Sequence, residues 1–175
     1  MKTTVLVGPS CSGKTSFAKV LEIVGWERII TYTTRPARTS EVNGVDYHFV
    51  SRELFDQLQH NGFFLETRSH NKADEGLVSY GTPSLRFGEH TENPRVIVLD
   101  PFGALAAYNS GTPVRIIWLD TPKWTRTERA LRRGDNPEEI KRRLDSDERD
   151  FADFEKYGIH DLRVGPSTSQ LFQVL

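Results

Sequence analysis

The chain has 175 residues, a formal net charge of −1 and 37% hydrophobic residues, the composition of a globular protein with room for one domain and a core. Its 23 basic and 24 acidic residues balance, so nothing global points to nucleic acid or a membrane as partner, and no run approaches the roughly 20 apolar residues that span a bilayer. The single cysteine excludes an internal disulfide and suits a reducing compartment, so we expect a cytoplasmic protein. Met1-Lys2-Thr3 runs directly into the first predicted strand without a long apolar segment and a cleavage site, so we expect no signal peptide.

The first predicted elements are a strand over 3–7, a glycine-rich loop over 8–15 and a helix over 16–24. The loop fits the phosphate-binding pattern G-x-x-x-x-G-K-[ST] in full, in the strand–helix setting that the pattern requires. Its backbone N–H groups and the helix N-terminus can bind phosphate, Lys14 can reach the β- and γ-phosphates, and the Thr15 hydroxyl can ligate Mg²⁺. The alternative is a glycine turn without a ligand. The sequence therefore predicts a nucleoside triphosphate site here.

The middle of the chain is rich in short strands and turns. In chain order the patterns predict the following elements: a strand over 28–32, a polar connector over 33–38, a turn at Asn43-Gly44, a strand over 45–50, a helix over 52–59 capped by Ser51, a strand over 63–67, a polar loop over 70–76, and a strand over 78–83 that leads into a helical segment near Leu85. We interpret 32–94 as a mixed α/β insertion on the core, not as an independent domain.

The last part alternates buried strands with helices. The patterns predict strands over 96–99, 114–119 and 162–164, helices over 104–109 and through Leu131, a helix that begins at Asn136-Pro137, and a closing helix over 167–175. Alternation of this kind at both ends implies a parallel β-sheet flanked by helices on both faces. We therefore expect one domain over 1–175, with a core of 1–31 and 95–175 and a helical lid at about 124–145.

Several motifs, in the correct order, resemble those of guanylate kinases. After the phosphate loop come Thr33-Thr34-Arg35-Pro36-Ala37-Arg38, Glu41-Val42-Asn43-Gly44-Val45-Asp46-Tyr47, Phe64-Leu65-Glu66, Tyr80-Gly81-Thr82 and Arg133-Gly134. Ser40 stands where that family has glycine. The resemblance covers about 5–161 and implies an α/β fold of the P-loop NTPase type with a nucleoside-monophosphate-binding insertion and a lid. It also implies transfer of the γ-phosphoryl of ATP to GMP or dGMP with Mg²⁺, by a monomer or homodimer.

The resemblance assigns roles to residues of this chain. The donor site would consist of Gly8, Ser10, Cys11, Ser12, Gly13, Lys14, Thr15, Ser16 and Arg129. The acceptor site would consist of Thr31, Arg35, Arg38, Tyr47, Glu66, Tyr80 and Thr82. The catalytic set would be Lys14, Arg35, Arg133 and Arg143, and Mg²⁺ would be held by Thr15 and Asp100.

The chemistry of these residue types agrees with those roles. Bringing two polyanions together demands dense positive charge, and the arginine fork suits phosphate. Guanine presents two adjacent donors, N1–H and N2–H, which an ionised Glu66 can accept together. Simpler alternatives remain: Tyr47 and Tyr80 can pack at a sheet edge, Thr31 and Thr82 can reflect β-propensity, and the lid arginines can form a solvated face. Arg126, Arg132 and Arg142 are expected at the surface.

Three departures from the family pattern leave open which molecule is the phosphoryl acceptor and how selective the site is for the base of the donor. The sequence Asp100-Pro101-Phe102-Gly103 lacks the second acid of the family's D-x-D-x-Q-G segment. The segment 70–79 is about five residues longer than usual, and 164–167 lacks the usual asparagine. Two alternatives to a guanylate kinase are therefore kept: a related kinase with another deoxynucleotide or a ribose phosphate as acceptor, and a guanylate-kinase-like interaction module.

Overall fold

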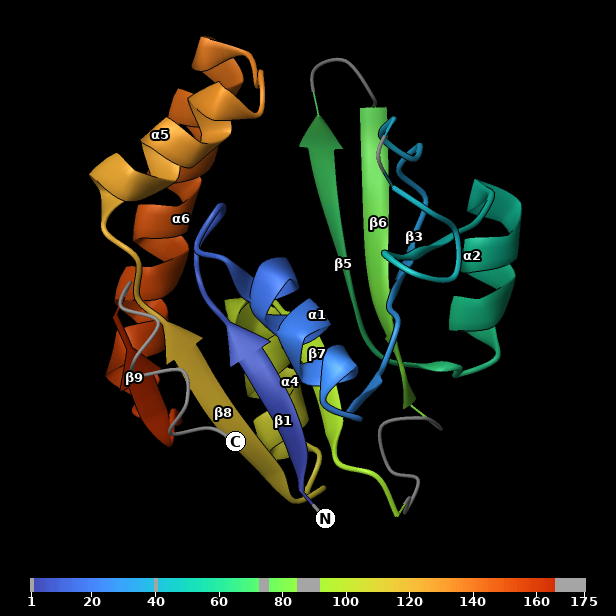
Figure 1. Cartoon of the computed structure of the whole chain (residues 1–175). Helices are drawn as coiled ribbons and strands as arrows, with labels where there is room; N and C mark the ends of the chain where they lie inside the picture. The colour runs from blue at the N-terminus through green and yellow to red at the C-terminus, as the bar shows by residue number, and fades with distance from the viewer. Residues whose placement is uncertain (1, 40, 73–75, 85–91, 166–175) are drawn as a thin grey trace.

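The computed structural model describes residues 2–39, 41–72, 76–84 and 92–165, which form two β-sheets with helices around them (Figure 1). The first sheet is five-stranded and parallel, in the order β2-β7-β1-β8-β9. Its strands are β1 (Thr3–Val7), β2 (Glu27–Arg28), β7 (Arg95–Leu99), β8 (Val114–Leu119) and β9 (Leu162–Val164). A parallel sheet flanked by helices confirms the predicted fold class.

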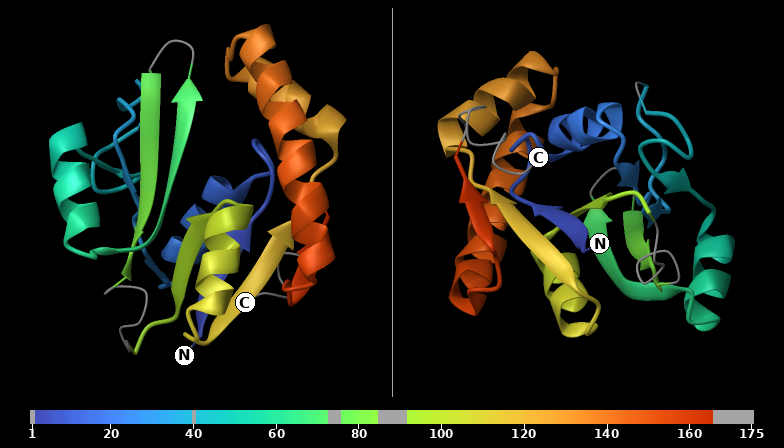
Figure 2. Two further views of the ribbon diagram at one scale, coloured as in Figure 1. Left: turned by 180° about the vertical axis from the view of Figure 1, so that it is seen from behind. Right: turned by 60° about the horizontal axis from the view of Figure 1, so that its bottom comes forward.

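Helices cover both faces of the parallel sheet, which is why its strands read as continuous apolar runs. On one face, Leu6 packs with Phe17 and Leu21 of α1 (Lys14–Ile23). On the other face, Val5 and Val7 pack with α4 (Pro101–Asn109) and α6 (Pro137–Tyr157), whose Phe154 is fully buried. Seen from behind in Figure 2, α4 and α6 lie in front of the sheet and α1 lies beyond it.

The second sheet has four strands in the order β4-β3-β6-β5, with β5 and β6 joined as a long antiparallel hairpin. Its strands are β3 (Tyr32–Thr33), β4 (His48–Phe49), β5 (Phe64–Lys72) and β6 (Gly76–Pro83). Helix α2 (Arg52–His60) covers one face, where Phe55 stacks on Phe64 with ring centroids 4.7 Å apart. The opposite face looks across the molecule toward α5 (Lys123–Arg132) and α6 (Figure 1).

The locally encoded helix starts are confirmed. Ser51 accepts the N–H of Leu54 at 3.2 Å as the N-cap of α2, and Asn136 caps α6 with Pro137 in the first turn. Helix α4 begins at Pro101, earlier than the predicted 104, because the Asp100 side chain caps it by accepting the N–H of Gly103. The predicted helices near Leu85 and over 167–175 lie outside the described residues.

Three predictions about strands were wrong. The single strand over 28–32 is split between two sheets, because the chain leaves the first sheet after Ile29, whose N–H still binds Val96, and joins the second at Tyr32. The strand over 45–50 is limited to His48–Phe49, since a turn closed by the Gly44 N–H and the Tyr47 carbonyl precedes it. The polar loop over 70–76 belongs to the β5–β6 hairpin, which pairs as far as Lys72 and Gly76.

The helical spacing of Phe17, Val20, Leu21 and Val24 predicts that all four face the core, but helix α1 buries only part of this set. Phe17, Ala18 and Leu21 are buried, while Val20 and Val24 are about half exposed. In the part of the chain that the structure describes, no helix is both long and apolar enough to cross a membrane.

Candidate active site

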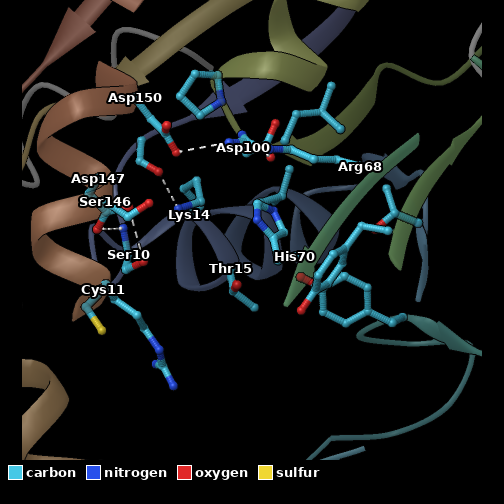
Figure 3. A pocket seen from close by; sticks show the side chains of 18 of the residues that line it. Ser10, Cys11, Lys14, Thr15, Arg68, His70, Asp100, Ser146, Asp147 and Asp150 are labelled. Atoms are coloured by element: carbon cyan, nitrogen blue, oxygen red, sulfur yellow. Dashed lines mark hydrogen bonds and ion pairs between the residues drawn. The ribbon is translucent and has the colours of Figure 1, made fainter. Parts of the chain in front are cut away.

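A cavity of about 400 Å³ lies between the two sheets and helix α6, with Arg133 at the end of α5 also lining it (Figure 3). Its volume is in the range of small-molecule sites. The following predicted site residues line it: Gly8, Ser10, Cys11, Lys14, Thr15, Thr31, Arg38, Tyr47, Glu66, Tyr80, Thr82, Asp100, Arg133 and Arg143. Of the predicted set, Ser12, Gly13, Ser16, Arg35 and Arg129 are not among the residues that line it. The fold thus brings both halves of the expected site to one cavity.

The phosphate loop joins β1 to α1, and two of its residues have positive φ angles, which suit glycine but are unfavourable for a residue with a side chain. Gly13 has a φ of 104°, and Cys11 has a φ of 59°, in the left-handed region that few non-glycine residues adopt. A Cβ at Gly8 would stand 2.7 Å from the carbonyl oxygen of Leu119. Glycine at position 8 is therefore required by the close passage of the loop over β8.

Lys14 lies under the loop that carries it. Its Nζ donates to the carbonyl oxygens of Gly8 at 2.6 Å and Pro9 at 2.9 Å. Burial lowers the pKa of Lys14 to about 8, against the opposing influence of the Asp147 carboxylate. Lys14 thus places a positive charge at the loop, where phosphate would bind.

Helix α5 and the residues just before it hold the loop from the other side. Arg129 of α5 donates to the carbonyls of Cys11 and Ser12, each at 3.1 Å, and Thr121 donates to Ser12 at 2.9 Å. Arg129 therefore acts on the backbone of the loop, although it does not line the cavity.

Asp147 also contacts the phosphate loop, although no sequence motif marks it. The predicted surface position of Arg126 was wrong. Asp147 of α6 accepts the Ser10 N–H at 2.9 Å and lies 3.3 Å from its hydroxyl oxygen. Arg126, expected at the surface, is 5% exposed and donates to Asp147 at 3.1 Å and to the Thr121 carbonyl at 3.0 Å. The burial of Arg126 depends on a partner 21 positions away, which no local pattern reveals.

Two tyrosines of the predicted acceptor set meet at the cavity wall. The rings of Tyr47 and Tyr80 lie 6.0 Å apart at an angle of 62°, and both line the cavity. Burial raises the pKa of Tyr47, so its phenol keeps its proton and can donate to an anion. Sheet-edge packing alone does not describe these residues, since both also face the cavity.

Arg35 lies behind this wall. It is 3% exposed, donates to Glu41 at 2.8 Å, and its guanidinium lies 5.6 Å from the ring centre of Tyr47. Glu41 also accepts the backbone N–H of Arg38 at 2.8 Å. In this structure one carboxylate therefore organises both arginines of the motif, and Arg38 is the one that reaches the cavity.

Glu66 stands on β5 at the cavity wall, beside a register shift between Phe64 and Glu66. Its carboxylate accepts the hydroxyl of Thr82 at 2.7 Å. Burial raises the pKa of Glu66 to about 7, and the nearby Asp100 adds to that effect. A Cβ at Gly103 would stand 3.3 Å from its Oε1, so Gly103 lets helix α4 approach the carboxylate closely.

Arg68 lines the cavity as well, although it was not among the predicted site residues. It follows Glu66 on the same face of β5 and reaches Asp100 at 3.1 Å and Asp150 of α6 at 3.4 Å (Figure 3). Its guanidinium lies 5.8 Å from the ring centre of Phe102. Its partners lie 32 and 82 positions away along the chain, so no local pattern marks it.

The residues proposed for Mg²⁺ are suitable in type. Thr15 and Asp100 both line the cavity and offer oxygen donors, and protein Mg²⁺ sites combine one or two such ligands with substrate phosphates and water. Asp100 Oδ1 accepts the Gly103 N–H and Oδ2 accepts Arg68, so each oxygen keeps one further lone pair. Among the described residues no group of three or more His, Cys, Asp and Glu side chains forms a self-sufficient metal site.

Arg133 and Arg143 share one carboxylate. Asp135 accepts from Arg133 Nε at 2.9 Å and from Arg143 Nη1 at 3.1 Å, and it was not predicted. Arg143 also pairs with Glu139, and Arg133 Nη2 lies 3.5 Å from the Cys11 sulfur. Arg133 therefore lies beside the phosphate loop, and both arginines line the cavity. Arg132 is exposed as expected, whereas Arg142 is exposed and also lines the cavity.

A parallel sheet whose first strand enters a complete phosphate loop defines a P-loop nucleotide-binding protein. The family model described as guanylate kinase matches residues 1–164. The chain therefore belongs to the guanylate kinase family, as its sequence motifs predicted.

Relatives and a solved structure agree with this. The guanylate kinase of Mycobacterium sp. (strain MCS) is 35% identical over 161 residues, covering 86% of this chain and 78% of its own. That of Mycobacterium bovis (strain ATCC BAA-935 / AF2122/97) is 33% identical over 187 residues, covering 99% and 86%. The crystal structure of guanylate kinase from Anaplasma phagocytophilum has a TM-score of 0.71 at 23% identity, covering 99% of this chain and 81% of that one, which supports the fold.

Proposed function

We propose that this chain transfers the γ-phosphoryl of ATP to the 5′-phosphate of GMP or dGMP, giving ADP and GDP or dGDP. The observation that carries the proposal is that the phosphate loop and Glu66 line one cavity, from opposite sheets. A donor site and an acceptor-base site in one cavity suit in-line transfer between two nucleotides.

On the donor side, Lys14 and the loop backbone would bind the triphosphate. Arg133 and Arg143 would neutralise the transferring phosphoryl group, since both already lie at the mouth of the loop. Thr15 and Asp100 would hold Mg²⁺, which when bound neutralises phosphate charge.

On the acceptor side, Arg38, Tyr47 and Tyr80 would bind the 5′-phosphate, with Arg35 fixing Tyr47 from behind. Thr31 and Thr82 would contact the base beside Glu66. Adenine presents a lone pair at N1, so a buried Glu66 carboxylate would remain unpaired against it. Sites of this kind discriminate by roughly 10⁴-fold.

We also propose the division of the chain made from its sequence: a core of 1–31 and 95–175, an acceptor insertion of 32–94, and a lid of about 124–145. The second sheet, built from residues within 32–83, supports the first boundary. A cytoplasmic location and a monomer or homodimer remain predictions.

One observation favours a second candidate, a related kinase with an altered acceptor. Phe102 stands in the segment where the family has a second acid, and Arg68 packs against it beside Glu66. The local charge of the acceptor wall therefore differs from the family pattern.

A steady-state panel of all common nucleoside and deoxynucleoside monophosphates, with MgATP as donor, tests the proposal. Activity confined to GMP and dGMP is expected. Preference for another monophosphate or a ribose phosphate would select the second candidate. Absence of turnover with every acceptor would favour an interaction module.

A further inference from the structure

The phosphate loop is held by a largely buried ion pair between helices α5 and α6. Arg126 of α5 and Asp147 of α6 lie 3.1 Å apart, with side chains 6% and 15% exposed. Asp147 Oδ2 also accepts the Ser10 N–H at 2.9 Å, and Oδ1 lies 3.3 Å from the Ser10 hydroxyl (Figure 3). The carboxylate therefore connects the loop to both lid helices.

Arg126 continues the connection to the other side of the loop. Its Nε donates to the Thr121 carbonyl at 3.0 Å, and the Thr121 hydroxyl donates to the Ser12 carbonyl at 2.9 Å. Ser10 and Ser12 are thus both held through the same ion pair. Such a network, with its charges paired and its hydrogen bonds made, fixes geometry more strongly than isolated contacts.

The residue between those two serines explains why the loop needs external support. Cys11 has a φ of 59°, and a non-glycine residue persists in that region only where its surroundings over-determine it. Asp147 fixes the residue before Cys11, and Thr121 fixes the residue after it. Without these contacts the backbone at Cys11 would relax, and the loop N–H groups would no longer converge on an anion.

We propose that Asp147, backed by Arg126, is a positioning residue for the donor nucleotide, because it holds the phosphate loop in its anion-binding shape. This deepens the proposed function and rests on it for the identity of the donor. A loop that already has its binding conformation binds more tightly, because less conformational entropy is lost when the ligand binds. Glu66, Tyr80 and Thr82 of the acceptor set stand on the second sheet. None of the contacts of Asp147 with Ser10 and Arg126 involves an acceptor residue, so we expect the effect to fall on ATP and to spare GMP.

The test compares Asp147→Ala with Glu148→Ala. Glu148 is the next acid on the same helix, but it is half exposed and pairs with Lys123 at 2.8 Å, away from the loop. Dissociation constants for MgATP and for GMP are measured separately by isothermal titration calorimetry on the full chain. We expect Asp147→Ala to weaken ATP about tenfold or more, the loss typical of a hydrogen bond to a charged group, with GMP within about twofold. Glu148→Ala should leave both unchanged.

A second variant separates positioning from stability. Arg126→Leu combined with Asp147→Ala leaves neither charge buried without a partner, and replacing a whole buried pair is often neutral for folding. We expect its melting temperature to recover toward that of the wild type while ATP binding stays weak. Asp147→Asn, whose amide oxygen can still accept the Ser10 N–H, should recover part of the affinity.

Three outcomes would overturn the proposal: ATP affinity within about twofold of wild type in the double variant, equal weakening of ATP and GMP, or recovery of ATP affinity together with melting temperature. If Asp147→Ala does not fold, the double variant and Asp147→Asn decide the question. A wild type that binds ATP but phosphorylates no guanine nucleotide would overturn the proposed function alone, since ATP binding remains measurable.

Discussion

The guanidinium of Arg68 lies 3.1 Å from the carboxylate of Asp100 and joins β5 of the second sheet to the end of β7. The same side chain reaches Asp150 of α6 at 3.4 Å, so three separate elements meet at one charge. Both ion pairs are partly exposed, which makes each one weak by itself. Together they hold β5 in place beside the cavity, and with it Glu66, which stands two residues before Arg68.

Replacing Arg68 by alanine should raise KM for GMP a few-fold and change kcat and KM for ATP less. Loss of two partly exposed ion pairs corresponds to about 1 kcal/mol in total. Steady-state kinetics at low and high salt provide the measurement, because screening should reduce the difference between variant and wild type. Arg132→Ala, which removes an exposed ion pair with Glu128, serves as the control. A salt-independent defect would contradict an ionic link.

Glu66→Gln should reduce kcat/KM for GMP by roughly 10²-fold or more, while ATP affinity is retained. The amide would present an N–H₂ group where guanine also presents donors, so one pair of donors would face each other. Kinetics with GMP and AMP, together with calorimetry for ATP, provide the measurement. An unchanged preference for guanine over adenine would show that another residue reads the base.

The same carboxyl predicts a pH dependence. Its pKa of about 7 in the folded protein lies above the unfolded value of 4.5, so folding favours the protonated form. Ionisation therefore costs stability as the pH rises from 4.5 to about 7, by up to about 3 kcal/mol, and Glu66→Gln should stabilise the free protein at pH 8 but not at pH 4. Chemical denaturation at both pH values measures this.

GMP binding should follow the opposite trend, because only the ionised carboxylate accepts both guanine donors. We expect GMP affinity to rise with pH to a plateau above pH 7, and this rise should be smaller in Glu66→Gln, where only the second ionisation of the nucleotide phosphate, at about pH 6, remains. A wild-type affinity for GMP that does not change between pH 5.5 and pH 8 would contradict the assignment of Glu66 as the base-reading residue.

Arg133→Ala and Arg143→Ala should each lower kcat by roughly 10²-fold with smaller changes in either KM, since both would act on charge that develops during transfer. Arg132→Ala is the matched control, adjacent in sequence and directed to solvent. Single-turnover measurements with saturating ATP and GMP separate the chemical step from product release. Equal effects from all three substitutions would indicate a general charge effect of the lid.

Lys14→Met should abolish turnover and leave the fold intact. The ammonium group lies under the loop on the carbonyls of Gly8 and Pro9, and methionine keeps most of the side-chain volume without the charge. Activity assays combined with a melting curve provide the measurement. Turnover at the wild-type rate would remove the phosphate-loop assignment.

The elements set by short-range signals were the predictable ones. Ser51 and Asn136 cap helices within three residues of themselves, and the apolar runs of β1, β7 and β8 need no distant information. The prediction of one strand over 28–32 was wrong because the residues of that run suit a strand throughout, so nothing in the run marks where the chain changes sheet. The change of sheet depends on pairing with β7 and β6, which lie far along the chain.

The candidate site was predictable where a motif marks it and not where partners are distant. Glu66 and Lys14 stand inside recognisable segments, and both line the cavity. Asp147 and Arg68 carry no local signature, since their roles arise from contacts with Ser10 and Asp100. The alternation of acids and bases in α5 and α6 is equally compatible with a solvated surface, so the burial of Arg126 could not be inferred.

The split of 28–32 between two sheets has an evolutionary consequence. Within the described residues no strand of the parallel sheet pairs with a strand of the second sheet. Insertions within 32–83, such as a longer β5–β6 hairpin, can therefore arise without breaking a ladder hydrogen bond of the parallel sheet. Such changes would leave the strand pairing around β1, and with it the base of the phosphate loop, as they are.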